Sequence, residues 1–296
     1  MDPAVDFHQH VWPDGFRRLL ERRTVPPKLR GRRLVLPCGG SFSVDPDAHA
    51  PEGRLAELDD AGLDAAVVSL PPTCEPTADL VEAWHEEAQQ LEAATKGRLV
   101  PLGYCTARQA FAGAIVPAPL LHRSAKLLER LQEQNQLAFV HPSASPPLRP
   151  AWRTPGVGYT HQMLDSYAWW IAFGAARFPT LEVVFALLGG GAPFQLERFA
   201  RRGLDAETAF VTNVWFETSS YGERALELSV RTFGAERLLF GSDAPVDRVQ
   251  TALRPVSALG PELEWATLRA NPRELLAHGR QRQAAEPARP AVRQPA

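Results

Sequence analysis

Short apolar runs recur along this 296-residue chain, and amphipathic helical patterns separate most of them. The eight runs span residues 4–8, 64–70, 98–104, 111–116, 137–141, 181–187, 210–216 and 237–241. They lack the alternation of polar and apolar residues that marks a strand with one solvent-exposed face. Continuous apolar runs are typical of parallel strands that are covered on both faces. Helical patterns at 53–62, 79–95, 120–134 and 163–178 fall between them. The pattern predicts an α/β fold, and the strand count favours a (β/α)8 TIM barrel over a doubly wound sheet.

Three stretches depart from this rhythm. About seven residues separate the third and fourth strands, too few for a crossover helix, so a shortened connection is expected there. Residues 13–52 follow the first strand and contain a hairpin-like pattern around Gly39-Gly40. Residues 279–296 are rich in Pro, Arg, Gln and Ala and predict a disordered tail. We therefore expect one domain over residues 1–278, with 13–52 inserted over the active-site mouth.

Composition excludes several classes of protein. The chain is 45% hydrophobic and has a formal net charge of −2, which excludes an intrinsically disordered protein and gives no general attraction to nucleic acid. Three cysteines are too few for a disulfide-stapled fold. No run of about 18 apolar residues predicts a membrane span. The start of the sequence lacks the pattern of a secretory signal, so we expect a cytoplasmic protein with reduced thiols.

Histidines and an aspartate follow the ends of three predicted strands, where a parallel barrel gathers its functional groups. His8 and His10 end the first strand and point to the same side, because side chains alternate along a strand. His141 ends the fifth strand, and Asp243 follows the eighth. A single His-x-His pattern is common by chance, but the coincidence at three strand ends predicts a site for one divalent metal. Such an ion would activate water or polarise a substrate oxygen.

The same segments carry a resemblance to a known family. They are Val5-Asp6-Phe7-His8-Gln9-His10, Phe139-Val140-His141-Pro142, Leu188-Gly189-Gly190-Gly191-Ala192-Pro193-Phe194 and Leu239-Phe240-Gly241-Ser242-Asp243-Ala244-Pro245. As a set they resemble the marker segments of the amidohydrolase superfamily, in particular the branch of aminocarboxymuconate-semialdehyde decarboxylase, resorcylate-type decarboxylases and lactone hydrolases. The resemblance spans roughly residues 4–278. It implies a barrel with one divalent ion, usually zinc and alternatively manganese, held by His8, His10, His141 and Asp243.

One position departs from the family pattern. The family usually places a histidine two residues before the triple glycine, where it activates water or holds a substrate oxygen, and this chain has Leu187. Leucine neither accepts a proton nor donates a hydrogen bond. Three hypotheses stay open. In the first, another group, namely His161, Glu217 or Asp243, replaces the histidine. In the second, the metal ion and the acidity of the substrate suffice for the reaction, as in a decarboxylation, and in the third the chain binds a ligand without catalysis.

Basic residues are concentrated in the long segment after the first strand. Between residues 17 and 33 there are eight of them, against the single acid Glu21. Arginine binds carboxylates through two parallel hydrogen bonds, so we expect Arg17, Arg32 or Arg33 to bind an anionic group of the substrate. A solvated surface or a contact in an oligomer is the alternative.

The sequence thus predicts a metal-dependent enzyme that hydrolyses a small carboxylated cyclic or aromatic substrate, such as a lactone or an amide. The alternatives are a non-oxidative decarboxylase of an aromatic or muconate-like acid and a non-catalytic ligand-binding barrel. The expected partner is a small anionic molecule, with a homodimer left open. We interpret the remaining histidines, His49, His85, His122 and His278, as structural or surface residues.

Overall fold

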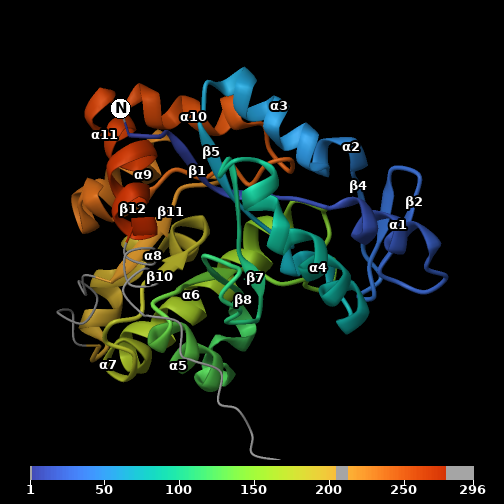
Figure 1. The fold of residues 1–296 in the computed structure, drawn as a ribbon. Coiled ribbons are helices and arrows are strands. Elements are labelled where there is room, and N and C mark those ends of the chain that lie inside the picture. Colours follow the sequence, from blue (N-terminus) through green and yellow to red (C-terminus); the bar gives the residue numbers. More distant parts are fainter. Residues whose placement is uncertain (1, 205–212, 278–296) are drawn as a thin grey trace, which may run out of the picture.

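The computed structural model describes residues 2–204 and 213–277, with parallel strands at its centre (Figure 1). These strands are β1 (Val5–His10), β5 (Ala65–Ser69), β6 (Leu99–Pro101), β7 (Gly103–Tyr104), β8 (Gly113–Pro117), β9 (Leu137–His141), β10 (Val183–Phe185), β11 (Val214–Glu217) and β12 (Leu238–Leu239). All eight predicted runs contain strand residues. Of the seventh run, residues 210–212 lie outside the described part of the chain.

Hydrogen bonds close these strands into a barrel. β1 pairs with β5 and β5 with β6, while β7 to β12 pair in chain order, and every pair is parallel. The amide of Leu102, between β6 and β7, donates to the carbonyl of Val68, so these two short strands act as one. At the other edge the amide of Phe7 donates to the carbonyl of Phe240 at 2.7 Å. The ring is complete, and the predicted (β/α)8 barrel is confirmed.

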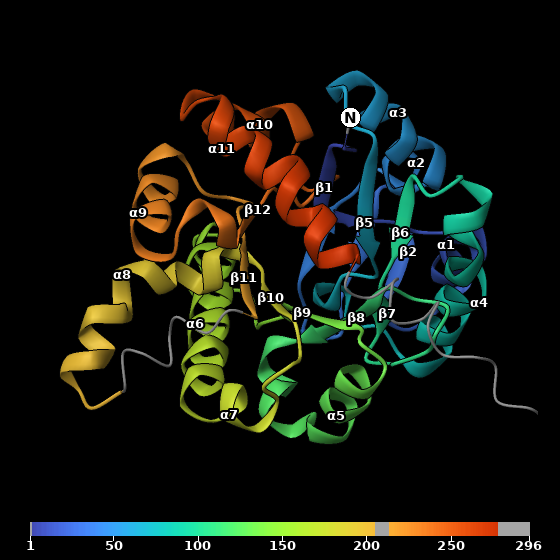
Figure 2. The same cartoon turned by 60° about the vertical axis from the view of Figure 1, so that its left-hand side comes forward.

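Helices surround the strands (Figure 2). They include α3 (Pro51–Ala61), α4 (Ala78–Ala94), α5 (Ala125–Glu133), α6 (Thr160–Trp169), α8 (Leu187–Arg201), α9 (Glu223–Phe233), α10 (Val249–Ala258) and α11 (Pro261–Trp265). The helix predicted over 120–134 is interrupted at Ser124, where a 3-10 segment passes into α5. No helix separates β7 from β8, which confirms the shortened connection. No helix in the described ranges is long and apolar enough to cross a membrane.

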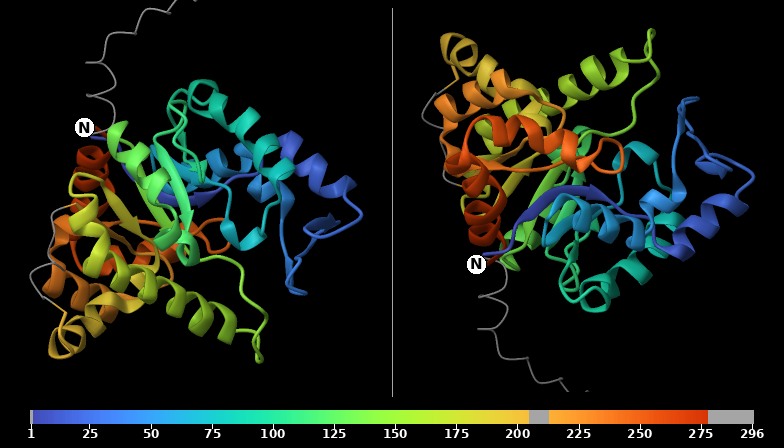
Figure 3. Two further views of the ribbon diagram at one scale, coloured as in Figure 1. Left: turned by 90° about the horizontal axis from the view of Figure 1, so that it is seen from below. Right: turned by 90° about the horizontal axis from the view of Figure 1, so that it is seen from above.

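The segment after β1 is more elaborate than the predicted hairpin. It holds α1 (Asp14–Arg22), β2 (Lys28–Arg30), β3 (Arg33–Val35), β4 (Ser41–Ser43) and α2 (Pro46–His49). The predicted hairpin is formed by β3 and β4, and β2 adds a third antiparallel strand to it. This insertion and the segment after β9 project on the same side of the molecule (Figure 3). The tail expected at 279–296 lies outside the described residues.

Close contact between β8 and β9 requires a glycine at position 113. A Cβ atom there would lie 2.3 Å from the carbonyl oxygen of Leu137, which is backbone and unable to move aside. We expect Gly113→Ala to lower the free energy of unfolding by about 1–3 kcal/mol, as overpacking does elsewhere. Chemical denaturation measures the change. Gly222→Ala is the control, because a Cβ at Gly222 meets nothing within 4 Å; equal losses in the two variants would contradict this explanation.

Candidate metal centre

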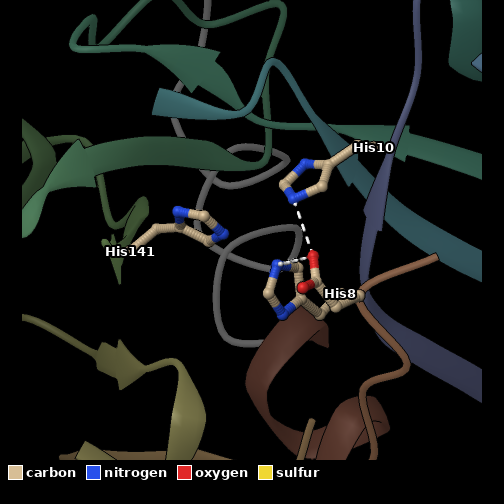
Figure 4. A group of neighbouring side chains, drawn as sticks. His8, His10 and His141 are labelled. Carbon is tan, nitrogen blue, oxygen red and sulfur yellow. Dashed lines mark ion pairs between the residues drawn. The ribbon is translucent and has the colours of Figure 1, made fainter. Parts of the chain in front are cut away.

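Four side chains meet at the C-terminal end of the barrel. His8, His10 and His141 turn toward one another, with ring centroids 4.9–5.1 Å apart (Figure 4). One carboxylate oxygen of Asp243 lies 3.0 Å from Nε2 of His10 and 3.5 Å from Nε2 of His8. One donor atom from each of the four residues lies within 4.8 Å of every other. The expectation that residues at the ends of parallel strands converge therefore placed these four residues together, although it could not supply the distances between them.

Each imidazole is held through its Nδ1 atom. Nδ1 of His141 donates to the carbonyl of Pro142 at 2.7 Å, and Nδ1 of His10 lies 3.2 Å from the hydroxyl of Ser69. Nδ1 of His8 lies 2.9 Å from the Glu217 carboxylate. Because each Nδ1 has a partner outside the cluster, each Nε2 is left to face the centre as a metal ligand would.

Glu217 lies behind His8 and does not line the pocket. It is completely buried at the end of β11, and its carboxylate accepts hydrogen bonds from the amide and hydroxyl of Ser219 and, at 3.3 Å, from the amide of Leu187. Gly241 makes room for it, since a Cβ there would lie 2.0 Å from the carboxylate. Glu217 thus orients His8 from behind.

The donor set fits a divalent ion. Nε2 of His8 is buried and makes no hydrogen bond. Nε2 of His10 and the Asp243 carboxylate are 3.0 Å apart. When Nδ1 of a neutral His10 donates to Ser69, both groups are acceptors, so a cation between them is favoured. Three imidazole nitrogens and one carboxylate are suitable ligands for zinc or manganese.

Burial and neighbouring charges set the protonation of the cluster. Burial lowers the pKa of His10 and of His141 well below the usual value, and the charge on His8 adds to this effect. Burial acts in the same direction on His8, but Glu217 and Asp243 outweigh it and raise the pKa of His8 to about 9. Burial raises the pKa of the Asp243 carboxyl group. Two of the three histidines are therefore neutral at pH 7, and His8 binds a proton that a metal ion would displace.

A pocket of about 630 Å³ opens beside the cluster, within the size range of small-molecule sites. Its wall combines His10, His141 and Asp243 with apolar and aromatic side chains from the insertion and from the segment after β9. The lining includes Trp12, Leu34, Phe42, Val44, Asp45, His49, Pro142, Pro155, Tyr159, Leu187, Tyr221 and Val246. No lysine or arginine belongs to this lining in the described part of the chain.

Leu187 lies in an unusual backbone segment. It lines the pocket, and it begins five consecutive residues with positive φ that continue through Leu188 to Gly191. Three of the five are glycines, which adopt this left-handed conformation at no steric cost. The segment forms the irregular first part of α8, directly after β10, and places an apolar side chain where the family pattern has a histidine.

Several candidate residues lie away from the pocket. His161 is exposed on α6, although the adjacent Thr160 lines the pocket. Arg17 lies beside Asp14 and Asp47, Arg32 pairs with Asp45 at 2.6 Å, and Arg33 donates to the hydroxyl of Ser41. Acidic and hydroxyl groups of the insertion itself thus hold these three arginines, and none of the three is in the lining.

Sequence reasoning missed some residues that the structure brings to the site. Ser69 ends β5 and could have been found by the rule that identified His141. Asp45 and His49 are four residues apart, which is one helical turn, but no strand-end signal marks them. Their place in the pocket wall follows only from the fold of the insertion.

Comparisons with known proteins identify the family. The family model described as amidohydrolase matches residues 116–277, more than half of the chain, so the chain belongs to the amidohydrolase family. This confirms the resemblance found in the marker segments. The matched range includes His141 and Asp243, while His8 and His10 precede it. No curated protein matches the chain.

Solved structures share the fold over almost the whole chain. IDCase from Metarhizium anisopliae is 20% identical, with a TM-score of 0.77 over 93% of this chain and 97% of that chain. 5-Carboxyvanillate decarboxylase from Sphingomonas paucimobilis is 19% identical, with a TM-score of 0.71 over 94% of this chain and 99% of that chain. Dihydroxybenzoic acid decarboxylase from Polaromonas sp. was solved with bound manganese and the inhibitor 2-nitroresorcinol. It is 16% identical, with a TM-score of 0.69 over 94% of this chain and 97% of that chain. Identities this low establish the fold alone.

The raised pKa of His8 makes metal binding depend on pH. Below about pH 9 an incoming ion must displace the proton on Nε2, so we expect about one proton released per ion at pH 7. The affinity should fall about tenfold for each pH unit of acidification below that value. Titration calorimetry in buffers of different ionisation enthalpy measures both quantities.

Glu217→Gln tests the cause of this dependence. Without the carboxylate, His8 loses its main reason to hold a proton at pH 7, so proton release should fall well below one. Loss of the orienting group should also weaken binding about 10–100-fold above pH 9. Glu223→Gln, an exposed change at the start of α9, is the matched control. Unchanged proton release in the Glu217 variant would refute the assignment.

Proposed function

We propose that this amidohydrolase-family chain is a metal-dependent decarboxylase that releases carbon dioxide from a small aromatic acid without oxidation. The pocket beside the metal centre carries the proposal: Leu187 offers no base, and the wall around it is mainly apolar. Hydrolysis needs a group that takes a proton from water, whereas decarboxylation needs one that gives a proton to carbon. The structural neighbours named as decarboxylases of aromatic acids also favour this choice over hydrolysis.

The ion would bind to His8, His10, His141 and Asp243, and when bound it supplies positive charge for the oxygen atoms of the substrate. Zinc and manganese both suit these ligands, and the Polaromonas enzyme is the precedent for manganese. Glu217, Ser69 and the carbonyl of Pro142 orient the three rings from outside the cluster. Because the described lining has no lysine or arginine, a substrate with a single carboxylate fits the pocket best.

Asp243 is the candidate proton donor. Burial raises the pKa of its carboxyl group, and one of its oxygens faces His8 and His10 while the side chain lines the pocket. In the reaction, the bond between the ring and the carboxyl group breaks and its electron pair stays on the ring carbon. That carbon takes the proton from Asp243, carbon dioxide leaves, and Asp243 regains a proton from water.

The aromatic wall suits a flat substrate. Trp12, Phe42, Tyr159 and Tyr221 line the pocket. Aromatic pairs in offset or edge-to-face contact gain about 0.5–1.5 kcal/mol beyond the area they bury. These residues would hold the ring and exclude water from the carbon atom that is protonated.

The reaction is tested with metal-loaded protein and a panel of aromatic acids, lactones and amides. We expect carbon dioxide from at least one aromatic acid, measured together with the appearance of the decarboxylated ring. Asp243→Asn should lower kcat by about 10²–10⁴-fold, as loss of a general acid does. Asp247→Asn, in the same loop but outside the pocket, is the control, and the metal content of both variants is measured. Turnover of a lactone or an amide without carbon dioxide would instead establish hydrolysis.

The arginines of the insertion have a separate test. Because Arg17 and Arg33 lie outside the lining and have partners of their own, Arg17→Ala and Arg33→Ala should change the KM of the accepted acid by less than about twofold. Steady-state kinetics decide the point. A tenfold rise in KM in either variant would support the hypothesis of a direct contact between that arginine and the substrate.

A further inference from the structure

His49 belongs to the pocket wall but not to the metal centre. It ends α2 of the insertion and is 6% exposed. Its ring stacks on Trp12, with 3.9 Å between the ring centroids and 23° between the planes. Both residues line the pocket that contains His10 and Asp243. The insertion thus adds a third imidazole to the pocket lining, beside His10 and His141, and this one is not a member of the metal centre.

Hydrogen bonds fix which nitrogen of His49 carries the proton. Nδ1 lies 2.8 Å from the carbonyl oxygen of Asp45, and only an N–H can bond to that oxygen. In a neutral ring, Nε2 is then a bare acceptor. No hydrogen bond to Nε2 is present in the described part of the chain.

The insertion holds this ring firmly. The carbonyl of Asp45 accepts from both the amide and the Nδ1 of His49, and the carbonyl of His49 accepts from the amide of Trp12 at 2.8 Å. The Asp45 carboxylate is in turn paired with Arg32 at 2.6 Å. Arg32 therefore supports the pocket wall from outside. A ring held in this way loses little freedom when it accepts a hydrogen bond from a ligand.

His49 is neutral at physiological pH. Burial lowers its pKa to about 4, and the charge on Arg54 acts in the same direction, while Asp45 and Asp243 act against it. His10 also interacts with His49 and is itself neutral at pH 7. Nε2 therefore stays unprotonated across the working range, which makes it a hydrogen-bond acceptor but a weak base.

Resting on the function proposed above, we infer that Nε2 of His49 accepts a hydrogen bond from a hydroxyl group of the substrate. The pocket thereby selects aromatic acids that carry a hydroxyl on the side of the ring facing the insertion. The hydroxyl groups of Thr73, Thr160 and Tyr159 in the lining can donate or accept and so adapt to many ligands. A bare imidazole nitrogen can only accept, so a substrate without the donor leaves it unsatisfied.

The test measures binding, so that it does not depend on turnover. Titration calorimetry on manganese-loaded protein compares benzoate, which has no hydroxyl donor, with its 2-, 3- and 4-hydroxy derivatives. We expect at least one hydroxy acid to bind about tenfold or more tightly than benzoate, the size of a hydrogen bond to a buried acceptor. His49→Phe keeps a ring against Trp12 but removes the acceptor, and it should abolish this preference while leaving the affinity for benzoate within about twofold.

His122→Phe, a change at an exposed histidine outside the pocket, is the control, and thermal unfolding verifies that each variant is folded. The inference is overturned if no hydroxy acid is preferred to benzoate, if no acid of the series binds, or if every such preference survives in His49→Phe. A merely structural role of His49 would weaken all the acids equally, which also overturns it. Binding with the expected preference but without carbon dioxide release would refute the decarboxylase proposal and leave this inference standing.

Discussion

The hydrogen bond between Nδ1 of His8 and Glu217 joins the first barrel strand to the seventh, and the rest of the centre depends on it. The bond fixes the tautomer of His8, aims Nε2 at the other donor atoms and places a buried negative charge directly behind the centre. Glu217 is itself fixed by Ser219 and by the amide of Leu187, so the end of β10 also contributes to the position of His8. The Glu217 carboxylate, at the end of β11, thus connects His8 of β1 with the residue that follows the end of β10.

The charges of the centre balance when an ion and a substrate anion are both present. His10, His141 and a singly protonated His8 are neutral, and Asp243 is neutral while it holds the proton that it donates. The divalent cation and the Glu217 carboxylate then leave one positive charge. An incoming carboxylate then adds one negative charge to a pocket whose other acid, Asp45, is already paired with Arg32. A second carboxylate on the ligand would find no cation in the described lining. This charge balance favours a substrate with a single negative charge.

The sequence was informative where periodicity and strand ends decide the structure. The eight strands were predictable because buried parallel strands form continuous apolar runs, and His8, His10, His141 and Asp243 were predictable because the ends of such strands converge. The insertion was not, because its fold depends on pairs such as Arg32 with Asp45 that no period reveals. The cluster of arginines indicated an anion site, but neighbouring acids and hydroxyls hold those side chains. The direction of Glu217 likewise depended on the space left by Gly241.

The left-handed run that begins at Leu187 makes the backbone path there independent of the chemistry of that side chain. Left-handed geometry costs about 1–2 kcal/mol for each residue with a Cβ, and three glycines leave only two leucines to bear that cost. The backbone path after β10 is therefore set by the glycines rather than by the side chain at position 187. A histidine and a leucine pose nearly the same steric problem there, since neither is branched at Cβ. Either residue is therefore compatible with the same backbone path, so the chemistry of the pocket can change at this position while the barrel stays the same.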